Sequence, residues 1–432
     1  MRTARKTQFV AIAAAMVATI SPQISVACPF CSAPSLTMTE QVAQNDLVIL
    51  VKWVDATRPP TRERPADEAL GEVSLRAGVA PGNARELART VFEIVDVLKG
   101  PAGDFKKGQQ VTLPQYRAAK KGDLFLLLGL KGVTIDWNTP LEFTEAAWTY
   151  VTSAPPPDQP TTERLKYFLE YLEFPDQDVA NDAYGEFANA PYEDITPLAD
   201  ELPRERLRKW VASNDTPVTR LGLYGLLLGL CGTEDDARLL ERKITEPTEE
   251  FRLGIDGIMG GYLILTGQQG LDLIDSTKLA SKHQVGPDGK PVLDKDGKPL
   301  GVPFSETYAA MQALRFMWQY GEDRISQDRL RQSMRTLLDR PELSDLVIAD
   351  LARWKDWSVQ EKLIGLYDQE GYDIPSIKRA IVRYLLACTK DRPESASDET
   401  PEHVAQAEKH LADLRAKDPK IVRDAERFYF PD

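Results

Sequence analysis

The hydrophobic pattern of the chain changes near residue 154. Before this point, apolar residues form short runs at 46–54, 90–98, 110–113 and 123–130, separated by glycine- and proline-containing turns. Runs of this length bounded by such turns are typical of β-strands, and the uniformly apolar run at 123–130 is typical of a central strand. The pattern therefore predicts a small β-rich domain over residues 28–153.

The stretch 55–88, between the first two runs, has a different composition. It contains Pro59, Pro60, Pro65 and Pro81, five arginines and few apolar residues. Such a segment has little apolar surface to bury, so we expect a mobile loop at 55–88. Its arginines leave two alternatives, a solvated loop or a contact with an acidic partner.

After a proline-rich linker at 154–162, apolar residues recur three or four positions apart, as at Leu165, Phe168 and Leu172. This spacing predicts amphipathic helices. Helix–turn–helix units recur loosely over 163–432, near 176–198, 216–244, 251–279, 305–338, 343–367 and 374–414. Each pair has more apolar surface than it can bury alone, which favours stacked repeats; a compact all-α bundle is the alternative.

One insertion interrupts the helical region, at about 285–302. Asp288-Gly289 and Asp296-Gly297 each follow or precede short apolar segments. Asp-Gly pairs in this setting predict tight turns, and hence a β-hairpin that projects from the helices. Counting from Asp294, a calcium loop would need glycine at Pro299 and glutamate at Ser305, so the segment does not fit that pattern.

The first 27 residues have the order of a secretory signal: Arg2, Arg5 and Lys6, an apolar run at 9–20, then Ser25-Val26-Ala27. Cleavage there predicts an exported protein that begins at Cys28. Lipid attachment to Cys28 is the alternative, although Ser25 stands where that signal has an aliphatic residue. No later apolar run is long enough for a transmembrane helix.

The whole chain has 432 residues, 42% of them apolar, and a formal charge of −13. The negative charge and the absence of a basic stripe in the sequence argue against nucleic acid as a partner. No phosphate-binding, metalloprotease or serine-hydrolase motif occurs, and the histidines at 283, 403 and 410 are widely spaced. We therefore expect no cofactor and no metal site.

Cys28-Pro29-Phe30-Cys31 is the sharpest local motif. Three interpretations remain open: a local disulfide favoured by export, a thiol–disulfide exchange site, or half of a zinc site. The other cysteines, Cys231 and Cys388, lie in apolar helical segments, where buried inert thiols are usual.

The β-rich region resembles the netrin-like or tissue-inhibitor-of-metalloproteinases domain. The resemblance rests on the cysteine start at 28–31, the strand at 46–51, Phe92-Glu93-Ile94 followed by Leu98-Lys99-Gly100, and 122–126. It implies an OB-type barrel and a Cys28 whose amine and carbonyl chelate a protease zinc. The C-x-x-C spacing and the lack of a downstream cysteine in this region depart from that family, which opens with C-x-C.

Residues 165–420 resemble HEAT-type or armadillo-like repeats. Together, these features predict a multidomain α+β protein, in which a small OB-like β-barrel precedes an all-α, solenoid-like domain. Within that domain, Trp354 and Trp357 stand three residues apart, either as an exposed interaction site or as core residues.

The function that this sequence favours is that of an exported, non-catalytic binding or scaffold protein whose partner is another protein. Two alternatives depend on the cysteine motif. One is a metalloprotease inhibitor that acts through Cys28. The other is a thiol–disulfide oxidoreductase that uses Cys28 and Cys31.

Overall fold

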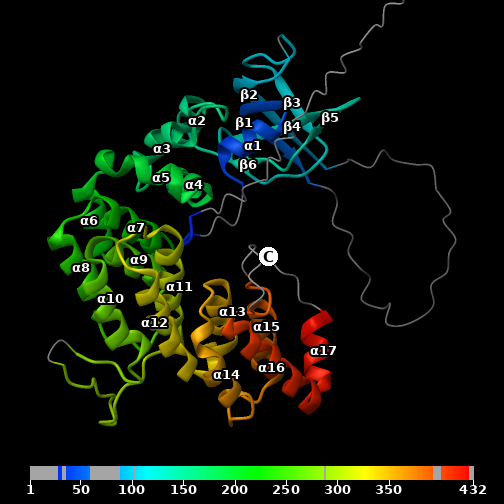
Figure 1. The fold of residues 1–432 in the computed structure, drawn as a ribbon. Helices are drawn as coiled ribbons and strands as arrows, with labels where there is room; N and C mark the ends of the chain where they lie inside the picture. The colour runs from blue at the N-terminus through cyan, green and yellow to red at the C-terminus, as the bar shows by residue number, and fades with distance from the viewer. Residues whose placement is uncertain are drawn as a thin grey trace, which may run out of the picture.

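The computed structural model describes residues 28–31, 36–58, 88–101, 103–286, 289–392 and 400–427. Within these ranges, a curled antiparallel sheet is followed by a long succession of helices, which extends from the sheet in an arc (Figure 1). The α+β class predicted from the sequence is therefore confirmed. The predicted signal peptide and residues 59–87 of the predicted loop lie outside the described residues.

The sheet has the strand order β3-β2-β1-β4-β5, and β6 also pairs with β4. Every pairing is antiparallel. The four apolar runs correspond to the first four strands, whereas the two short edge strands were not predicted. The strands are β1 (Leu47–Thr57), β2 (Arg89–Lys99), β3 (Gln110–Leu113), β4 (Leu124–Lys131), β5 (Ile135–Trp137) and β6 (Leu141–Glu142).

The sheet curls because the register between β1 and β2 shifts at three places along β1. Such irregularities bend a strand and increase its twist. The curl brings the ring of Phe105 to 5.9 Å from the ring of Trp137 on β5. No pairing between β3 and β5 is found among the described residues, so the sheet is a half-barrel. The more specific OB-type barrel stays a prediction.

Both faces of the sheet are buried, which explains the uninterrupted apolar runs of β1 and β4. The concave face encloses one apolar cluster that includes Ile49, Phe92 and Phe125. On the opposite face, Leu50 and Leu126 join the core of the helical region. The outer face of the sheet and the helices therefore share a hydrophobic core, while the concave face has a cluster of its own. The division into a β domain and a helical domain stays a prediction.

Two helices lie within the region predicted to be β-rich. Helix α1 (Met38–Gln44) begins at a capping box in which Thr37 and Glu40 bond each other's backbone N–H groups. Helix α2 (Glu145–Ser153) begins at Thr144, whose hydroxyl accepts from the Ala147 N–H. The predicted linker at 154–162 is thus a short connection from α2 to α3.

The remaining helices follow one another along the arc, with neighbours α7, α9 and α11, and then α13, α15 and α17, side by side (Figure 1). None of the helices in the described ranges is long and apolar enough to cross a bilayer. Their bounds are α3 (Thr161–Leu169), α4 (Gln177–Asn189), α5 (Tyr192–Ile195), α6 (Arg204–Ala212), α7 (Leu221–Cys231), α8 (Glu234–Thr245), α9 (Ile255–Thr266), α10 (Gln268–Ile274), α11 (Phe304–Tyr320), α12 (Gln327–Thr336), α13 (Ser344–Arg353), α14 (Gln360–Leu366), α15 (Pro375–Cys388), α16 (Glu402–Lys417) and α17 (Pro419–Arg427).

The insertion between α10 and α11 projects from the array (Figure 1). Isolated bridges join His283 to Gly301, Val285 to Pro291 and Leu293 to Pro299, so the segment folds back on itself twice rather than forming one regular hairpin. At its base, the Gln284 amide accepts from the Thr248 N–H at 2.9 Å and donates to the Thr248 carbonyl at 2.6 Å. This pairing fixes the insertion to the α8–α9 connection.

Candidate functional site

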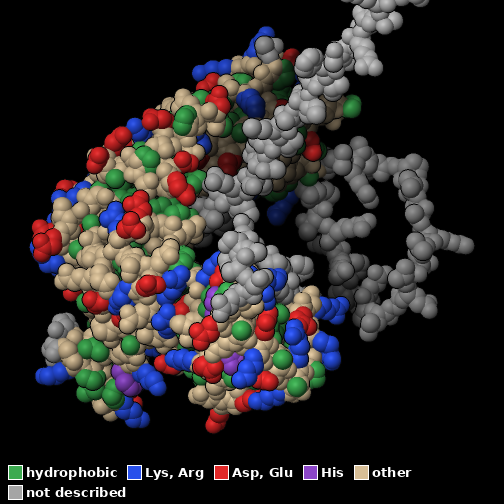
Figure 2. Space-filling view, viewed as in Figure 1, with side chains coloured by type: hydrophobic (Ala, Val, Ile, Leu, Met, Phe, Trp, Pro, Cys, Tyr) green, Lys and Arg blue, Asp and Glu red, His purple; other side chains and the backbone are tan. Residues whose placement is uncertain are grey.

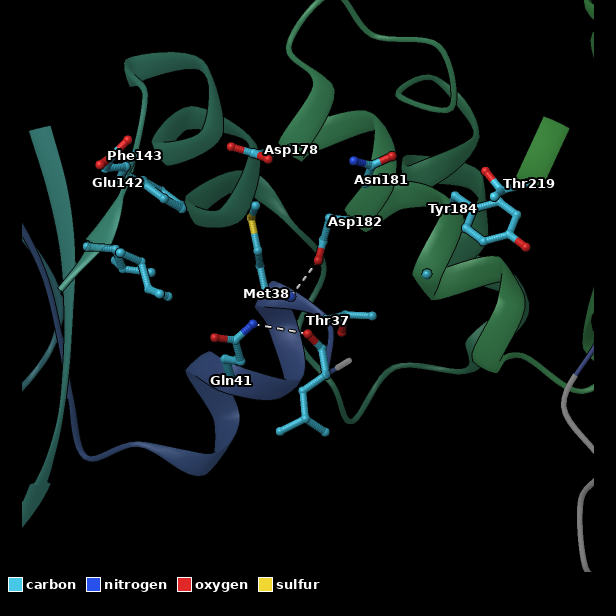
Figure 3. Close-up of a pocket in the computed structure, with 14 residues that line it drawn as sticks. Thr37, Met38, Gln41, Glu142, Phe143, Asp178, Asn181, Asp182, Tyr184 and Thr219 are labelled. Carbon is cyan, nitrogen blue, oxygen red and sulfur yellow. Dashed lines mark hydrogen bonds between the residues drawn. The ribbon is translucent and has the colours of Figure 1, made fainter. Parts of the chain in front are cut away.

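A pocket of about 540 Å³ lies where the sheet meets the helical array, between α1, α4 and the β4–β6 edge (Figure 3). It exists because α1 and α4 cover only part of the outer sheet face. Within the described ranges, the lining combines apolar side chains with carboxylates and other polar groups, without Lys, Arg, His or Cys. These residues are Leu36, Thr37, Met38, Gln41, Leu126, Leu141, Glu142, Phe143, Asp178, Asn181, Asp182, Tyr184, Gly185 and Thr219.

The sheet side of the pocket is apolar. Leu126 on β4 is paired directly with Leu141 on β6, so both side chains point to the same face. Leu141 is 39% exposed and Leu36, just before α1, is 48% exposed. Large exposed apolar side chains beside a concave surface mark interaction sites.

The helix side of the pocket is acidic. Asp178 and Asp182 are four residues apart on α4 and therefore share a face of that helix. In Asp182, Oδ1 accepts from the Met38 N–H at 2.6 Å and Oδ2 accepts from the Tyr150 hydroxyl at 2.8 Å. Burial raises the pKa of Asp182 to about 6, although both hydrogen bonds favour its charged form.

The two other carboxylates differ in their partners. Glu142 is paired with Arg117 at 2.7 Å. Asp178 is exposed and forms no ion pair within the part of the chain that the structure describes. The pocket consequently carries negative charge that no lining cation balances, with Asp178 as its accessible carboxylate.

The walls of the pocket are held in place by a second network behind α1. Arg164 pairs with Glu186 at 3.0 Å and donates to the Thr39 hydroxyl at 3.0 Å. The Thr39 hydroxyl in turn donates to Glu186. These groups are largely buried, so α1 is fixed to α4 independently of any ligand.

Among the residues that the structure describes, the ionisable groups of the lining are carboxylates, together with the Tyr184 phenol. Asp182 is the one whose pKa is raised toward neutrality. In the described ranges, no group of three or more His, Cys, Asp or Glu side chains is arranged to hold a metal ion.

The structure joins Cys28 and Cys31 in a disulfide. Cys28 is only 3% exposed, and its carbonyl accepts from the Cys31 N–H at 3.2 Å. Neither sulfur is therefore a thiolate ligand for zinc, and the Cys28 carbonyl does not face solvent as an inhibitor of the netrin-like type would require.

The remaining cysteines are free thiols inside the helical array. Burial raises the pKa of Cys231 to about 11 and that of Cys388 to about 12. Both thiols stay protonated at neutral pH and are poor nucleophiles. Cys388 is thus the inert buried thiol that was predicted, whereas Cys231 is equally unreactive but only half-buried.

The interpretation of Trp354 as an exposed interaction residue is wrong. Trp354 is 4% exposed and stacks on Trp318 with ring centroids 4.3 Å apart. Trp357 is half-buried, and its indole N–H donates to Asp391 at 2.7 Å. Both tryptophans hold neighbouring helices together, because large aromatic rings bury more surface between helices than at an open face.

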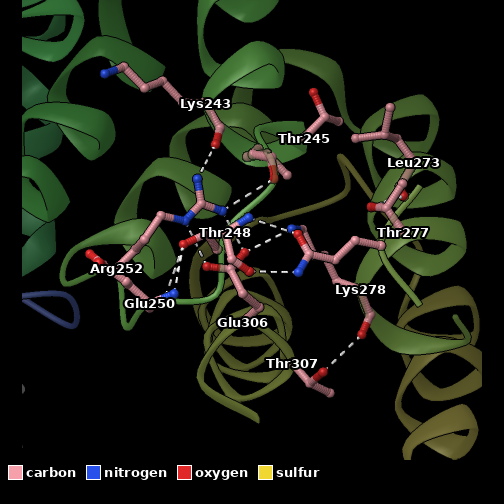
Figure 4. Close-up of polar contacts among 12 residues, drawn as sticks. Lys243, Thr245, Thr248, Glu250, Arg252, Leu273, Thr277, Lys278, Glu306 and Thr307 are labelled. Atoms are coloured by element: carbon pink, nitrogen blue, oxygen red, sulfur yellow. Dashed lines mark hydrogen bonds and ion pairs between the residues drawn. The ribbon is translucent and has the colours of Figure 1, made fainter. Parts of the chain in front are cut away.

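A buried ion cluster joins Arg252 from the α8–α9 connection, Lys278 just after α10 and Glu306 on α11 (Figure 4). Glu306 is fully buried and receives bonds from Arg252 at 2.6 and 2.9 Å and from Lys278 at 2.8 Å. Burial lowers the pKa of Lys278; burial alone would raise that of Glu306, but Arg252 and Lys278 lower it. The Glu306 carboxylate is thus shared by two cations inside the core.

None of the pocket residues was predicted as a site from the sequence. Two local signals were nevertheless present: the Thr37–Glu40 capping-box spacing before α1, and the two aspartates four residues apart at 178 and 182. On the face shown in Figure 2, acidic and basic side chains are interspersed over the helices, without a continuous basic stripe. Comparison of the chain with protein-family models, curated proteins and solved structures finds no match.

Proposed function

We propose that this chain is an exported, non-catalytic binding protein that takes a segment of another protein in the pocket between α1, α4 and β6. The observation that carries the proposal is the lining, in which an apolar sheet side faces an acidic helix side and none of the described lining residues is a cation. Export is supported by the sequence of residues 1–27.

The lining selects for a particular side-chain chemistry. Lysine and arginine combine a long apolar stem with a cationic end. Leu126, Leu141 and Met38 all line the pocket and offer apolar surface to such a stem. The cation would then reach Asp178 on α4, which lies beyond the end of the Met38 side chain in Figure 3. A neighbouring leucine in the same segment would fill the rest of the apolar side. The expected ligand is thus a peptide segment with alternating basic and apolar residues.

The two alternative functions lack comparable support. A protease inhibitor of the netrin-like type requires an accessible Cys28 amine and carbonyl, and a thiol oxidoreductase requires an accessible reactive thiolate. Burial of Cys28 argues against the inhibitor, and against an oxidoreductase in which Cys28 is the attacking thiolate.

The test is a titration of the protein against two fluorescently labelled peptides, one alternating lysine and leucine and one alternating glutamate and leucine. Fluorescence anisotropy should show saturable binding of the lysine peptide alone. Asp178→Asn should weaken it by about 5- to 10-fold, as expected for a partly exposed charge pair. Asp323→Asn, in an exposed position after α11, is the matched control and should leave the affinity unchanged.

Equal binding of the two peptides would contradict the proposal, because it would show that the carboxylates do not select the ligand. An affinity unchanged by Asp178→Asn would place the binding elsewhere on the molecule. Failure of either peptide to bind would exclude this class of ligand.

A further inference from the structure

Residues 28–31 form a small closed loop that is inserted into the helical array. Phe30 is 9% exposed, and its ring lies 4.9 Å from the ring of Phe316 on α11. The same loop contacts α7 and α9. The first described residues of the chain are thus part of the core, next to helices almost two hundred or more residues away in sequence.

The receiving surface is shaped by glycines. A Cβ atom on Gly260 of α9 would lie 2.6 Å from the Phe30 ring, and one on Gly222 of α7 would lie 2.9 Å from the Phe30 carbonyl oxygen. Real Cβ atoms do not approach so closely. The fit of the loop therefore depends on two positions without side chains, which distinguishes this contact from general hydrophobic packing.

The two sulfurs of the disulfide differ in access. Cys28 is 3% exposed, whereas Cys31 is only half-buried. Thiol–disulfide exchange requires an incoming thiolate to approach one sulfur in line with the bond. Of the two residues, Cys31 is the one that reaches the surface, so an incoming thiolate meets Cys31 first.

We propose that the Cys28–Cys31 disulfide is a modification site for a dithiol reductant, and that its oxidation state controls how firmly the loop is held in the array. A thiolate of the reductant attacks Cys31 Sγ, the disulfide breaks, and Cys28 leaves as a thiolate that takes a proton. The second thiol of the reductant then displaces Cys31. Two electrons pass to the protein, which gains two thiols, while the reductant becomes a disulfide.

Reduction weakens the loop through chain entropy. The disulfide closes a loop with a sequence separation of three residues. Closing a loop of about four residues lowers the conformational entropy of the undocked chain. This reduces the undocked population roughly 20-fold. Reduction should therefore raise the undocked population about 20-fold. Helix α1 should stay in place, because Met38 and Thr39 have their own bonds to α4.

The first test is hydrogen exchange on the full chain, oxidised and after reduction with a phosphine. The Cys31 N–H, which donates to the Cys28 carbonyl, should exchange about 20-fold faster after reduction, once corrected for its intrinsic rate. The Gln41 N–H, bonded to the Thr37 carbonyl in α1, is the internal control and should not change. Equal protection of Cys31 in both states would overturn the proposal.

The second test identifies the attacked sulfur. A thioredoxin whose resolving cysteine is replaced by serine traps the mixed disulfide, and mass spectrometry of the digest locates it. The expected adduct is on Cys31, in wild type and in the Cys231→Ser control. An adduct on Cys28, or none after prolonged incubation, would refute the assignment. Both readouts are independent of peptide binding, so this proposal and the proposed function fail separately.

Discussion

Individual carboxylates in this molecule differ sharply according to what surrounds them. Asp182 is half-buried beside two neutral donors, and the loss of solvent around its carboxyl raises its pKa to about 6. Glu306 is more completely buried, but two cations lower its pKa. The ionised carboxylate of Asp182 therefore disfavours folding, whereas that of Glu306 is stabilised by its two cations. Substitutions at the two positions should change the free energy of unfolding in opposite directions.

Asp182→Asn should stabilise the protein at neutral pH. Folding raises the pKa of Asp182 from 3.8 to about 6, so the native state favours the protonated acid. The stability that protonated Asp182 contributes is present at low pH and is lost as the pH rises from about 4 to 6. The asparagine keeps an oxygen acceptor for the Met38 N–H. We expect a gain of about 1–3 kcal/mol in the free energy of unfolding at pH 7.5 and little gain at pH 4. Urea unfolding at both pH values measures it; a loss of stability at pH 7.5 would contradict this account.

Glu306→Gln should be strongly destabilising, because it leaves Lys278 and Arg252 without their shared counter-charge in the core (Figure 4). Breaking a buried ion cluster in this way costs about 3–5 kcal/mol. The matched control is Glu234→Gln, which removes an exposed pair with Arg238 and should change stability by less than about 0.5 kcal/mol. Similar unfolding midpoints for the two variants would show that the buried ion cluster contributes little to the free energy of unfolding.

At the scale of helices, the contact between α7 and α9 depends on glycines. Their sequences are apolar on nearly every side, since both helices are enclosed by neighbours. A Cβ on Gly261 of α9 would lie 2.0 Å from the Gly225 carbonyl oxygen of α7. The backbones of α7 and α9 therefore contact each other directly, with no side chain between them.

Gly261→Ala should force α7 and α9 apart and lower the free energy of unfolding by about 1–3 kcal/mol or more. Gly365→Ala on α14 is the opposite case, since nothing lies within 4 Å of its added Cβ. Better helix propensity should there stabilise the protein by roughly 0.5–1 kcal/mol. Calorimetric melting of both variants checks the pair, and a stable Gly261→Ala would mean that the helices are not in backbone contact.

Much of the element-level organisation could be read from the sequence. The four apolar runs became β1 to β4, and the 3.6-residue spacing after residue 160 became helices. Helices α1 and α2 were missed because each is short and lies beside strong strand signals. Periodicity along the chain does not encode tertiary packing. Tertiary packing is what places Trp354 in the core and what brings Asp178 and Asp182 into one pocket with Leu141.

At the scale of the whole molecule, the sheet and the helical array are joined through one core. Leu50 and Leu126 on the outer sheet face belong to the same apolar cluster as residues as far along as α17. The sequence suggested independent units, because a proline-rich segment at 154–162 resembles a linker. In the structure, residues 154–160 connect α2 to α3. Because the outer face of the sheet is packed into the core of the array, we expect the sheet to unfold together with the adjoining helices.

Leu50→Ala tests this coupling. Removing a fully buried leucine costs about 2–5 kcal/mol. Fluorine-labelled tryptophans at Trp53 in β1 and Trp210 in α6 report on the sheet and the array separately. Both reporters should shift to the same lower urea midpoint. A shift at Trp53 alone would show that the sheet is an independent folding unit.

The pocket between α1, α4 and β6 lies at this junction, and its selection of a basic, apolar peptide is the central claim. A charge exchange tests it most directly: the affinities of the lysine–leucine and glutamate–leucine peptides are measured for wild type and for Asp178→Lys. The account predicts that the variant loses at least about 10-fold in affinity for the lysine peptide and gains affinity for the glutamate peptide. Unchanged affinities for both peptides would contradict it.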